Sequence, residues 1–220
     1  MEEKYEKPSV TVDIVVFTIQ NNDLKVLLVK RDIEPFKGKW AIPGGFVRMD
    51  ESLEEAAKRE LQEETGVKEI YLEQLYTFGD PKRDPRGRVI TVSYMALVNS
   101  EKIKLEATTD VSEAQWFSVK KLPSLAFDHK KILGYALKRL KWKFEYTIVA
   151  FSFLPKGFTM GQVQIIYETV FGRKFDKRNF AKKIMSLNIL REEGIKKDVS
   201  HRPPMSYSLK NNIGNIVEIL

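Results

Sequence analysis

Residues 45–67 read GFVRMDESLEEAAKRELQEETGV, and this stretch decides the fold. Its spacing is a glycine, five residues, a glutamate, seven residues and then Arg-Glu-apolar-x-Glu-Glu-x-Gly-apolar, so nine positions are specified. From average residue usage, a chance match in a chain of 220 residues has a probability of roughly 10⁻⁷. The pattern therefore indicates a defined structural unit with a defined chemistry.

The stretch predicts a helix from about Ser52 to Thr65. Ser52 followed by Glu55 is a capping-box pattern, most of the intervening residues are good helix formers, and Gly66 is a natural terminator. At roughly 100° per residue, three acids fall within an arc of about 100°. They are Glu60, Glu63 and Glu64.

These acids lie beside apolar residues of the same helix, such as Leu53, Ala56 and Ala57. Like charges on a partly buried side are costly unless a cation lies among them, whereas an ordinary solvated acidic stripe lies opposite the apolar residues. Hard cations require oxygen ligands, and Mg²⁺ takes a few carboxylates together with substrate phosphate oxygens. The helix therefore predicts a site for Mg²⁺ or Mn²⁺.

The stretch resembles the Nudix box, which implies an α/β (α+β) fold, the Nudix α/β/α sandwich with a mixed sheet. The resemblance also implies metal-dependent cleavage of a nucleoside diphosphate linked to another group. It makes the carbonyl of Gly44 a metal ligand beside the three acids, and the absence of a Cβ in the turn before the helix allows that approach. By the same resemblance, Arg59 is expected to pair with a box acid and to orient it. The general base comes from the box, where Glu60 is the choice, or from a later segment, where Glu113 is either an extra metal-binding acid or an ordinary surface acid.

Apolar runs predict the remaining strands. Residues 10–19 and 24–29 are joined by Asn21-Asn22-Asp23, a hairpin signal. Further strands are expected over 70–78, 89–98 and 115–119, with a helix near 130–141. We expect Asp128 and His129 to start that helix rather than to form a site. The Nudix domain is expected to span residues 1–145.

Between two of these strands lies Gly79-Asp-Pro-Lys-Arg-Asp-Pro-Arg-Gly-Arg88, with two prolines and four basic residues. It resembles the substrate loop of ADP-ribose pyrophosphatases and their regulatory relatives. Arg83, Arg86 and Arg88 are the residues expected to contact phosphate or ribose oxygens. A charged turn stiffened by prolines is the alternative.

The excess of positive charge is confined to one end of the chain. Residues 1–140 carry 23 Lys+Arg and 23 Asp+Glu, whereas residues 141–220 carry 14 and 7 and account for the net charge of +7. A neutral domain followed by a basic one suggests a polyanionic partner. The chain has no cysteine and no apolar run long enough to span a membrane, so we expect a cytoplasmic protein without a membrane partner.

Residues 146–220 are expected to form a winged helix-turn-helix domain that binds double-stranded DNA. Thr159 can cap a helix over 160–170 that Gly172 closes, and Asp176 can cap a second helix over 177–190, before a hairpin over 191–209. The predicted DNA-binding residues lie on the second helix and at the hairpin tip. They are Lys177, Arg178, Asn179, Lys182, Lys183, His201 and Arg202. The alternative is a winged helix that serves for protein docking or dimerisation, with a basic face that is merely solvated.

The whole chain resembles the Nudix-related transcription regulators, which pair such a domain with a winged helix and act as homodimers. Three readings remain. The first is a DNA-binding regulator whose Nudix domain binds, and hydrolyses at some rate, ADP-ribose or a related nucleotide. The second is an ADP-ribose pyrophosphatase that yields AMP and ribose 5-phosphate, with an accessory winged helix. The third is a pentose-responsive regulator, which the intact acids disfavour.

Overall fold

The computed structural model describes residues 6–66, 71–98, 111–195, 204–211, 213 and 216–219, without the side chains of Glu64, Thr65 and Val111. The chain forms two compact units, one of residues 1–18 and 25–137, the other of residues 19–24 and 138–220. The boundary between the units, after residue 137, comes before residue 145, where the sequence predicts the Nudix domain to end. That predicted domain limit stays a prediction. In the described part of the chain, no helix is both long and apolar enough to cross a membrane.

The first unit is built on a mixed seven-stranded sheet in the order β3-β2-β1-β6-β5, to which β4 (Gly44–Phe46) adds on β1 and β7 on β2. Strand β1 (Ser9–Gln20) runs parallel to β6 (Val89–Leu97), and β6 is antiparallel to β5 (Tyr71–Phe78). On the other side, β2 (Asp23–Arg31) is antiparallel to β3 (Trp40–Ala41) and β7 (Val111–Ser118). The hairpin predicted between β1 and β2 is confirmed, because Asn21 and Asn22 have φ values of 52° and 57°, which asparagine tolerates.

The predicted box helix is confirmed as α1 (Leu53–Thr65). The side chain of Ser52 accepts the N–H of Glu55, whose carboxylate accepts the N–H of Ser52, so both partners of the capping box are present. Gly66 ends the helix with φ 71°, a left-handed conformation that glycine adopts at no steric cost. Both ends of the acid-bearing helix are therefore fixed by local hydrogen bonds.

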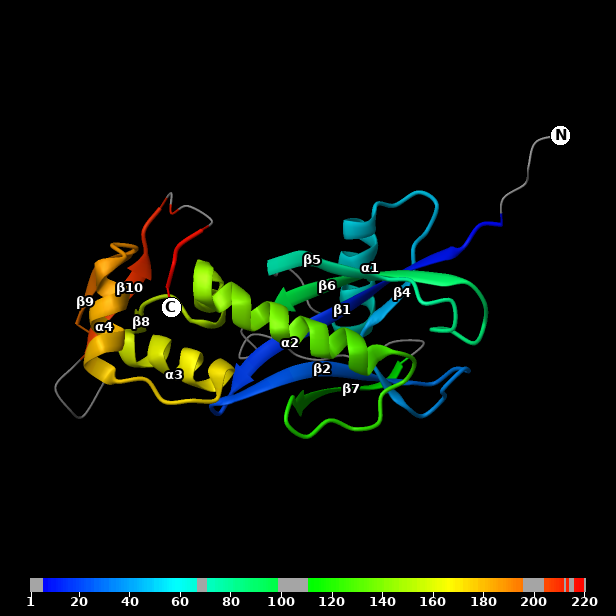
Figure 1. The fold of residues 1–220 in the computed structure, drawn as a ribbon, viewed down its shortest axis with the longest axis horizontal. Coiled ribbons are helices and arrows are strands. Elements are labelled where there is room, and N and C mark those ends of the chain that lie inside the picture. The colour runs from blue at the N-terminus through cyan, green and yellow to red at the C-terminus, as the bar shows by residue number, and fades with distance from the viewer. Residues whose placement is uncertain are drawn as a thin grey trace. The chain divides into compact units, whose positions relative to one another are not determined.

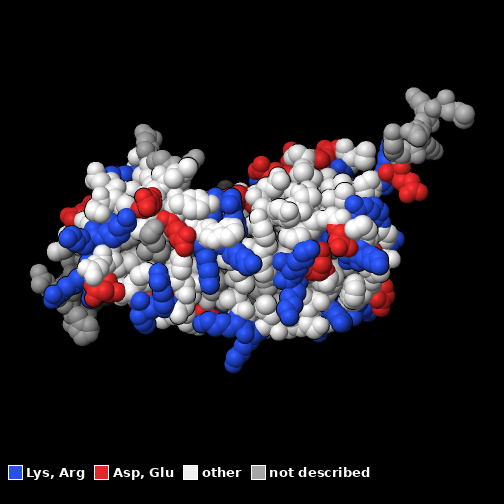
Figure 2. Space-filling view, viewed as in Figure 1, with Lys and Arg blue, Asp and Glu red and all other residues white. Residues whose placement is uncertain are grey.

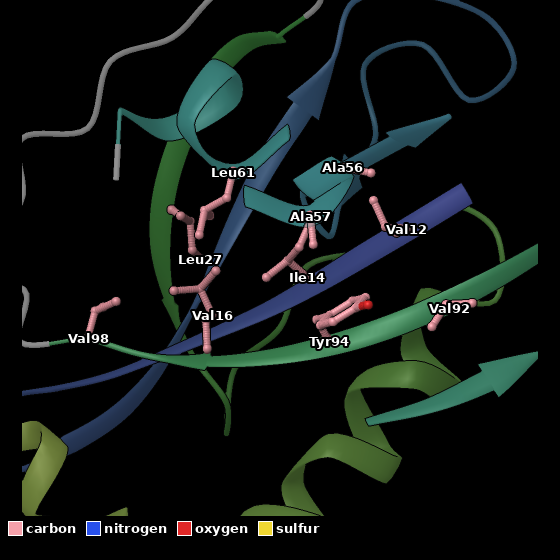
Figure 3. Close-up of a cluster of buried hydrophobic side chains, with 11 residues drawn as sticks. Val12, Ile14, Val16, Leu27, Ala56, Ala57, Leu61, Val92, Tyr94 and Val98 are labelled. Carbon is pink, nitrogen blue, oxygen red and sulfur yellow. The ribbon is translucent and has the colours of Figure 1, made fainter. Parts of the chain in front are cut away.

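Small residues of α1 place the helix close to the sheet. Ala56 and Ala57 are fully buried, and they pack with Leu61 against alternate residues of β1, such as Val12 and Ile14 (Figure 3). Figure 1 shows α1 and the first part of α2 (His129–Tyr146) on opposite sides of the sheet. Helix α2 begins where the sequence predicted, but it extends five residues beyond the expected end at residue 141.

The second unit has the order of a winged helix. After the 3₁₀ helix η2 (Ile148–Phe153) come α3 (Met160–Phe171) and α4 (Lys177–Ser186), and β8 (Phe158–Thr159), β10 (Met205–Leu209) and β9 (Leu190–Ile195) form an antiparallel sheet in that order. The buried ring of Tyr167 anchors its core, 5.1 Å from the ring of Phe144 and 5.3 Å from that of Phe180.

The predicted caps of this unit are confirmed, but the predicted length of the second helix is wrong. Thr159 and Gly172 bound α3, and Asp176 caps α4 by accepting the N–H of Asn179. Helix α4 ends at Ser186 rather than at residue 190, because Asn188 takes a left-handed φ of 53° and Leu190 already belongs to β9. The apolar residues at the end of the expected helix instead lead into the hairpin formed by β9 and β10.

Candidate functional site

The first unit contains a pocket of about 200 Å³ beside the box helix. Its walls come from β1, β2, the segment 41–46, α1, the loop 83–86 and the start of α2. Charged and aromatic side chains line much of it. The charged ones are Asp13, Arg31, Glu60, Arg83, Asp84 and Arg86, and the aromatic ones are Phe46, Phe127 and His129.

Glu60 reaches the pocket because the turn beside it has no side chains. A Cβ on Gly45 would lie 2.2 Å from Oε1 of Glu60, and one on Gly44 would lie 2.1 Å from the carbonyl oxygen of Val12. Real Cβ atoms do not approach other atoms so closely, so Gly44, which meets the backbone, requires glycine, whereas a side chain at position 45 would displace the carboxylate of Glu60. The turn therefore brings its backbone against the carboxylate of Glu60.

Arg59 donates hydrogen bonds to three acids of the box. Its Nε and Nη2 donate to the two carboxylate oxygens of Glu51 at 2.8 and 2.6 Å, and its Nη1 donates to Glu60 at 2.6 Å and to Glu63 at 3.0 Å. The bonds from Arg59 lower the pKa of Glu51 to about 2, and the bond to Glu51 in turn raises the pKa of Arg59. The structure thus gives Arg59 the orienting contacts that the sequence predicted.

The acids have an environment that a divalent cation would complete. Burial raises the pKa of Glu60 despite its bond with Arg59, so a second cation would favour the ionised form. Glu60 and Gly44 line the pocket whereas Glu63 does not, and carboxylates and backbone carbonyls are oxygen ligands of the kind that Mg²⁺ and Mn²⁺ take. The side chain of Glu64 lies outside the described residues, and the side chains that are described include no cluster of three metal-ligating groups. The predicted set of metal ligands, Gly44, Glu60, Glu63 and Glu64, therefore stays a prediction.

Arg83 is held in a buried ion network on the pocket wall. Its Nη2 lies 2.8 Å from Oδ1 of Asp128 and 3.3 Å from Oδ2 of Asp13, and only 4% of its side chain is exposed. Nε of Arg83 also donates to Oδ2 of Asp128 at 3.2 Å. The predicted substrate residue thus already has two carboxylate partners within the protein.

His129 extends this network at the start of α2. Its Nδ1 accepts the N–H of Ile42 at 2.9 Å, and its Nε2 lies 3.6 Å from Oδ1 of Asp13. Burial lowers the pKa of His129, so the ring is neutral at neutral pH. Asp128 and His129 do lie at the start of a helix as predicted, but His129 also lines the pocket, a role that the sequence did not predict.

Arg86 is clamped at the rim. Asp84 accepts three bonds from it, from the backbone N–H, from Nε and from Nη2, at 2.9, 3.0 and 2.7 Å. Burial opposes the ionisation of Asp84, but these bonds outweigh it and leave the pKa of Asp84 below its ordinary value. The guanidinium carbon of Arg86 lies 5.0 Å from the ring centre of Phe46 and 5.5 Å from that of Phe127, both cation–π distances.

Two predicted site residues lie elsewhere. Arg88 is not in the pocket wall; its Nη1 donates to the carbonyl of Gly79 at 2.7 Å and closes the loop. Glu113 faces Lys30 across β7 and β2 at 3.8 Å with half of its side chain exposed, and it too is absent from the pocket wall. Its geometry is that of a surface acid.

The sequence reasoning missed Asp13, Phe46, Asp84 and Phe127 as pocket residues. Asp13 carried a signal, because it is a charged residue within the apolar run of β1 and is 6% exposed. Phe46 and Asp84 lie within the box stretch and the loop 79–88 that the sequence singled out, but they were not chosen as site residues there.

In the second unit, the predicted DNA-contacting residues of α4 lie exposed around a short apolar stripe. Phe180 and Ile184 are buried, while the exposed residues include four cations and no acid. They are Lys177, Arg178, Asn179, Lys182 and Lys183. His201 and Arg202 lie outside the described residues. On the face shown in Figure 2, both basic and acidic side chains lie over this unit, whereas α4 itself carries only basic charges.

The capped acid-bearing helix, the glycine turn and the arginine-lined pocket define a Nudix domain, and the second unit defines a winged helix. The family model for the NUDIX domain matches residues 8–139, and that for the NrtR DNA-binding winged helix domain matches residues 150–209. The chain belongs to the Nudix family, among the Nudix-related transcription regulators.

Three relatives show this similarity. The chain is 35% identical over 207 residues, covering 92% of it and 82% of the relative, to the ADPR responsive transcriptional repressor NtrR of Acinetobacter baylyi. It is 42% identical over 139 residues to the ADP-ribose pyrophosphatase of Methanocaldococcus jannaschii, covering 63% of this chain and 77% of that one. The crystal structure of Shewanella oneidensis NrtR complexed with a 27mer DNA matches with a TM-score of 0.80 and 37% identity, covering 91% of this chain and 93% of that one.

Proposed function

We propose that this protein is a DNA-binding transcription regulator with two domains. In this proposal the Nudix domain, residues 1–145, binds ADP-ribose or a related nucleoside diphosphate derivative with Mg²⁺ or Mn²⁺. The winged helix, residues 146–220, binds double-stranded DNA as part of a homodimer in the cytoplasm. The observation that carries the proposal is that one chain joins a charged, aromatic-rimmed pocket beside the box acids to a helix α4 with four exposed cations and no acid.

The pocket chemistry supports a nucleotide ligand. Carboxylates at the box helix suit a divalent cation that screens a diphosphate, and Arg86 is a fixed planar donor near them. Phe46, which is 45% exposed, offers a flat apolar surface for a base or ribose ring. The names of the repressor and pyrophosphatase relatives refer to ADPR and ADP-ribose.

The second unit supports duplex DNA as partner. A helix presented after a turn, with cations on the side opposite its buried stripe, suits the major groove and its phosphates. The similar Shewanella protein was crystallised with DNA over nearly the same length of chain. Two copies binding two half-sites would follow the two-fold symmetry of regulators of this shape.

Hydrolysis of the ligand is the second candidate function. The box is intact, Glu60 stands at the pocket wall, and the pyrophosphatase relative shares 42% identity. A bound cation would screen the diphosphate and acidify a water, and the products would be AMP and ribose 5-phosphate. Glu60 is better placed as general base than Glu113, because only Glu60 lines the pocket.

Fluorescence anisotropy tests the regulator proposal, with the full chain titrated onto duplex DNA from upstream of its own gene, with and without ADP-ribose. Arg178→Ala/Lys182→Ala should weaken binding and reduce the slope of log K against log salt by about one unit for each phosphate that the protein no longer neutralises. The control Lys37→Ala/Lys39→Ala removes the same charge from exposed positions of the Nudix unit and should leave the slope unchanged. Equal slopes for both double variants would refute DNA binding through α4.

The ligand is tested separately. Glu63→Gln/Glu64→Gln should abolish AMP release from ADP-ribose in the presence of Mg²⁺ while DNA binding without ligand stays intact. Lack of an ADP-ribose effect on DNA binding in the unaltered protein, together with no AMP release, would remove ADP-ribose from the proposal.

A further inference from the structure

The backbone changes partner strands at the pocket wall. Ala41, in β3, pairs with β2, whereas Gly44, in β4, pairs with β1, so the chain crosses between the two pairings at Ile42 and Pro43. The carbonyl of Pro43 accepts the N–H of Ile14 at 2.8 Å, and proline has no N–H of its own. The N–H of Ile42, a residue only 2% exposed, is therefore the donor that this crossing must satisfy.

The imidazole of His129 satisfies it. Nδ1 accepts the Ile42 N–H at 2.9 Å, so the neutral ring carries its proton on Nε2, which lies 3.6 Å from Oδ1 of Asp13. The other oxygen of Asp13 is held by Arg83 at 3.3 Å, and the face of the imidazole lies 5.3 Å from the ring of Phe127. The ring is thus held at Nδ1 by a hydrogen bond, and Phe127 packs against it.

We propose that His129 is a positioning residue for the ligand site, acting through the N–H of Ile42 to hold the backbone of residues 42–45. This inference rests on the proposed function, because the backbone that it holds includes the Gly44 carbonyl expected at the metal. It assigns a role to the Asp128-His129 motif, which the sequence reasoning had treated as a helix start.

The backbone of β4 at Gly44 has no room in which a displacement could be absorbed. At Gly44 and Gly45 an added Cβ would meet Val12 and Glu60 at 2.1 and 2.2 Å, so the backbone there is packed directly against β1 and against the box acid. If the Ile42 N–H loses its acceptor, the crossing must shift to find another, and the Gly44 carbonyl and the Gly45 contact with Glu60 shift with it.

Two substitutions of His129 test the roles of Nδ1 and Nε2 separately. His129→Asn places an amide oxygen near the position of Nδ1 and keeps an acceptor for Ile42. His129→Gln carries its amide further out, toward the position of Nε2 and Asp13, and leaves the Ile42 N–H without its acceptor. The two variants lose the imidazole equally, so a general loss of packing would affect both.

The test is the affinity of the full chain for Mn²⁺, measured by electron paramagnetic resonance in the presence of the α,β-methylene analogue of ADP-ribose, which cannot be cleaved. His129→Gln should bind Mn²⁺ about 10- to 100-fold more weakly than the unaltered protein, as is usual when a partner behind a metal ligand is removed. His129→Asn should stay close to the unaltered protein. Calorimetry of the analogue in EDTA should show similar affinities for all three proteins.

Equal Mn²⁺ affinity in the Gln and Asn variants would overturn the inference. An unaltered protein that binds neither the analogue nor Mn²⁺ would instead overturn the proposed ligand. If the Gln variant does not fold, the unaltered ¹⁵N-labelled protein decides, because a scalar coupling between the Ile42 nitrogen and Nδ1 of His129 must appear across the hydrogen bond. Absence of that coupling would also overturn the inference.

Discussion

Replacing Arg83 with methionine should destabilise the Nudix unit by about 3–5 kcal/mol, the usual cost of removing one partner from a buried ion pair. The side chain of Arg83 is 4% exposed, and those of Asp13 and Asp128 are 9% and 18% exposed. Methionine fills a similar volume but leaves two carboxylates without their cation, away from water that would solvate them. The cost is a large fraction of a typical stability of about 5–15 kcal/mol.

Urea unfolding followed by tryptophan fluorescence measures this change in the right unit. Trp40 and Trp116 lie in the Nudix unit, and Trp142 lies in the other. A Trp142→Phe background therefore makes the signal specific to the unit that contains Arg83. The free energy of unfolding is the extrapolation of the transition to zero urea.

Two further variants serve as controls for Arg83→Met. Lys58→Met breaks an exposed pair with Glu54, in which both side chains are 62% exposed, and should cost about 0.5 kcal/mol or less. Adding Asp13→Asn and Asp128→Asn to Arg83→Met should recover most of the loss, because the stranded charges are gone. A cost for Arg83→Met as small as that for Lys58→Met would refute the claim that the network is buried and mutually dependent.

Three further outcomes are expected. Gly45→Ala should weaken Mn²⁺ binding by at least about tenfold, because its Cβ would lie 2.2 Å from Oε1 of Glu60; calorimetric affinity equal to that of the unaltered protein would contradict the close approach. The bond from Lys174 lowers the pKa of Glu168 from 4.5 to about 2, so the ionised carboxylate stabilises the fold fully above about pH 4.5 and this contribution is lost as the pH falls toward 2. The difference in thermal midpoint between the unaltered protein and Glu168→Gln should shrink over that range, and a difference independent of pH would argue against the assignment. Tyr167→Phe should stabilise the protein by about 1–3 kcal/mol in urea unfolding, since the buried hydroxyl has no hydrogen-bond partner among the described residues; destabilisation would reveal a partner.

Elements bounded by local signals were predictable from the sequence. Helix α1 has a capping box at Ser52 and a left-handed glycine at Gly66, and α3 has the same pair of signals at Thr159 and Gly172. Such signals act within a few residues, so they can be read without knowing the fold. The end of α4 was missed because the apolar residues after it continue a helical spacing, and asparagine is a weaker terminator than glycine.

Only part of the candidate site could be predicted from the sequence. The box acids and their arginine are local to one helix, and Arg59 makes the contacts expected of it. The partners of Arg83 are 70 and 45 residues away in sequence, and the partner of His129 is 87 away. No spacing rule connects such positions. Only the fold shows that Arg83 is buried, that Arg86 is bound by Asp84 and that Arg88 lies outside the pocket wall.

The fixed ends of α1 make the box sensitive to length. Because Ser52 caps the first turn and Gly66 ends the last, each residue of the helix has a fixed direction around the helix axis. One residue inserted between Ala57 and Arg59 would rotate the following acids by about 100° about the helix axis and carry Glu60 away from the glycine turn. Substitutions on the outer side of this helix leave that angle untouched, whereas any single-residue insertion or deletion changes it, which is why such a motif is defined by its intervals.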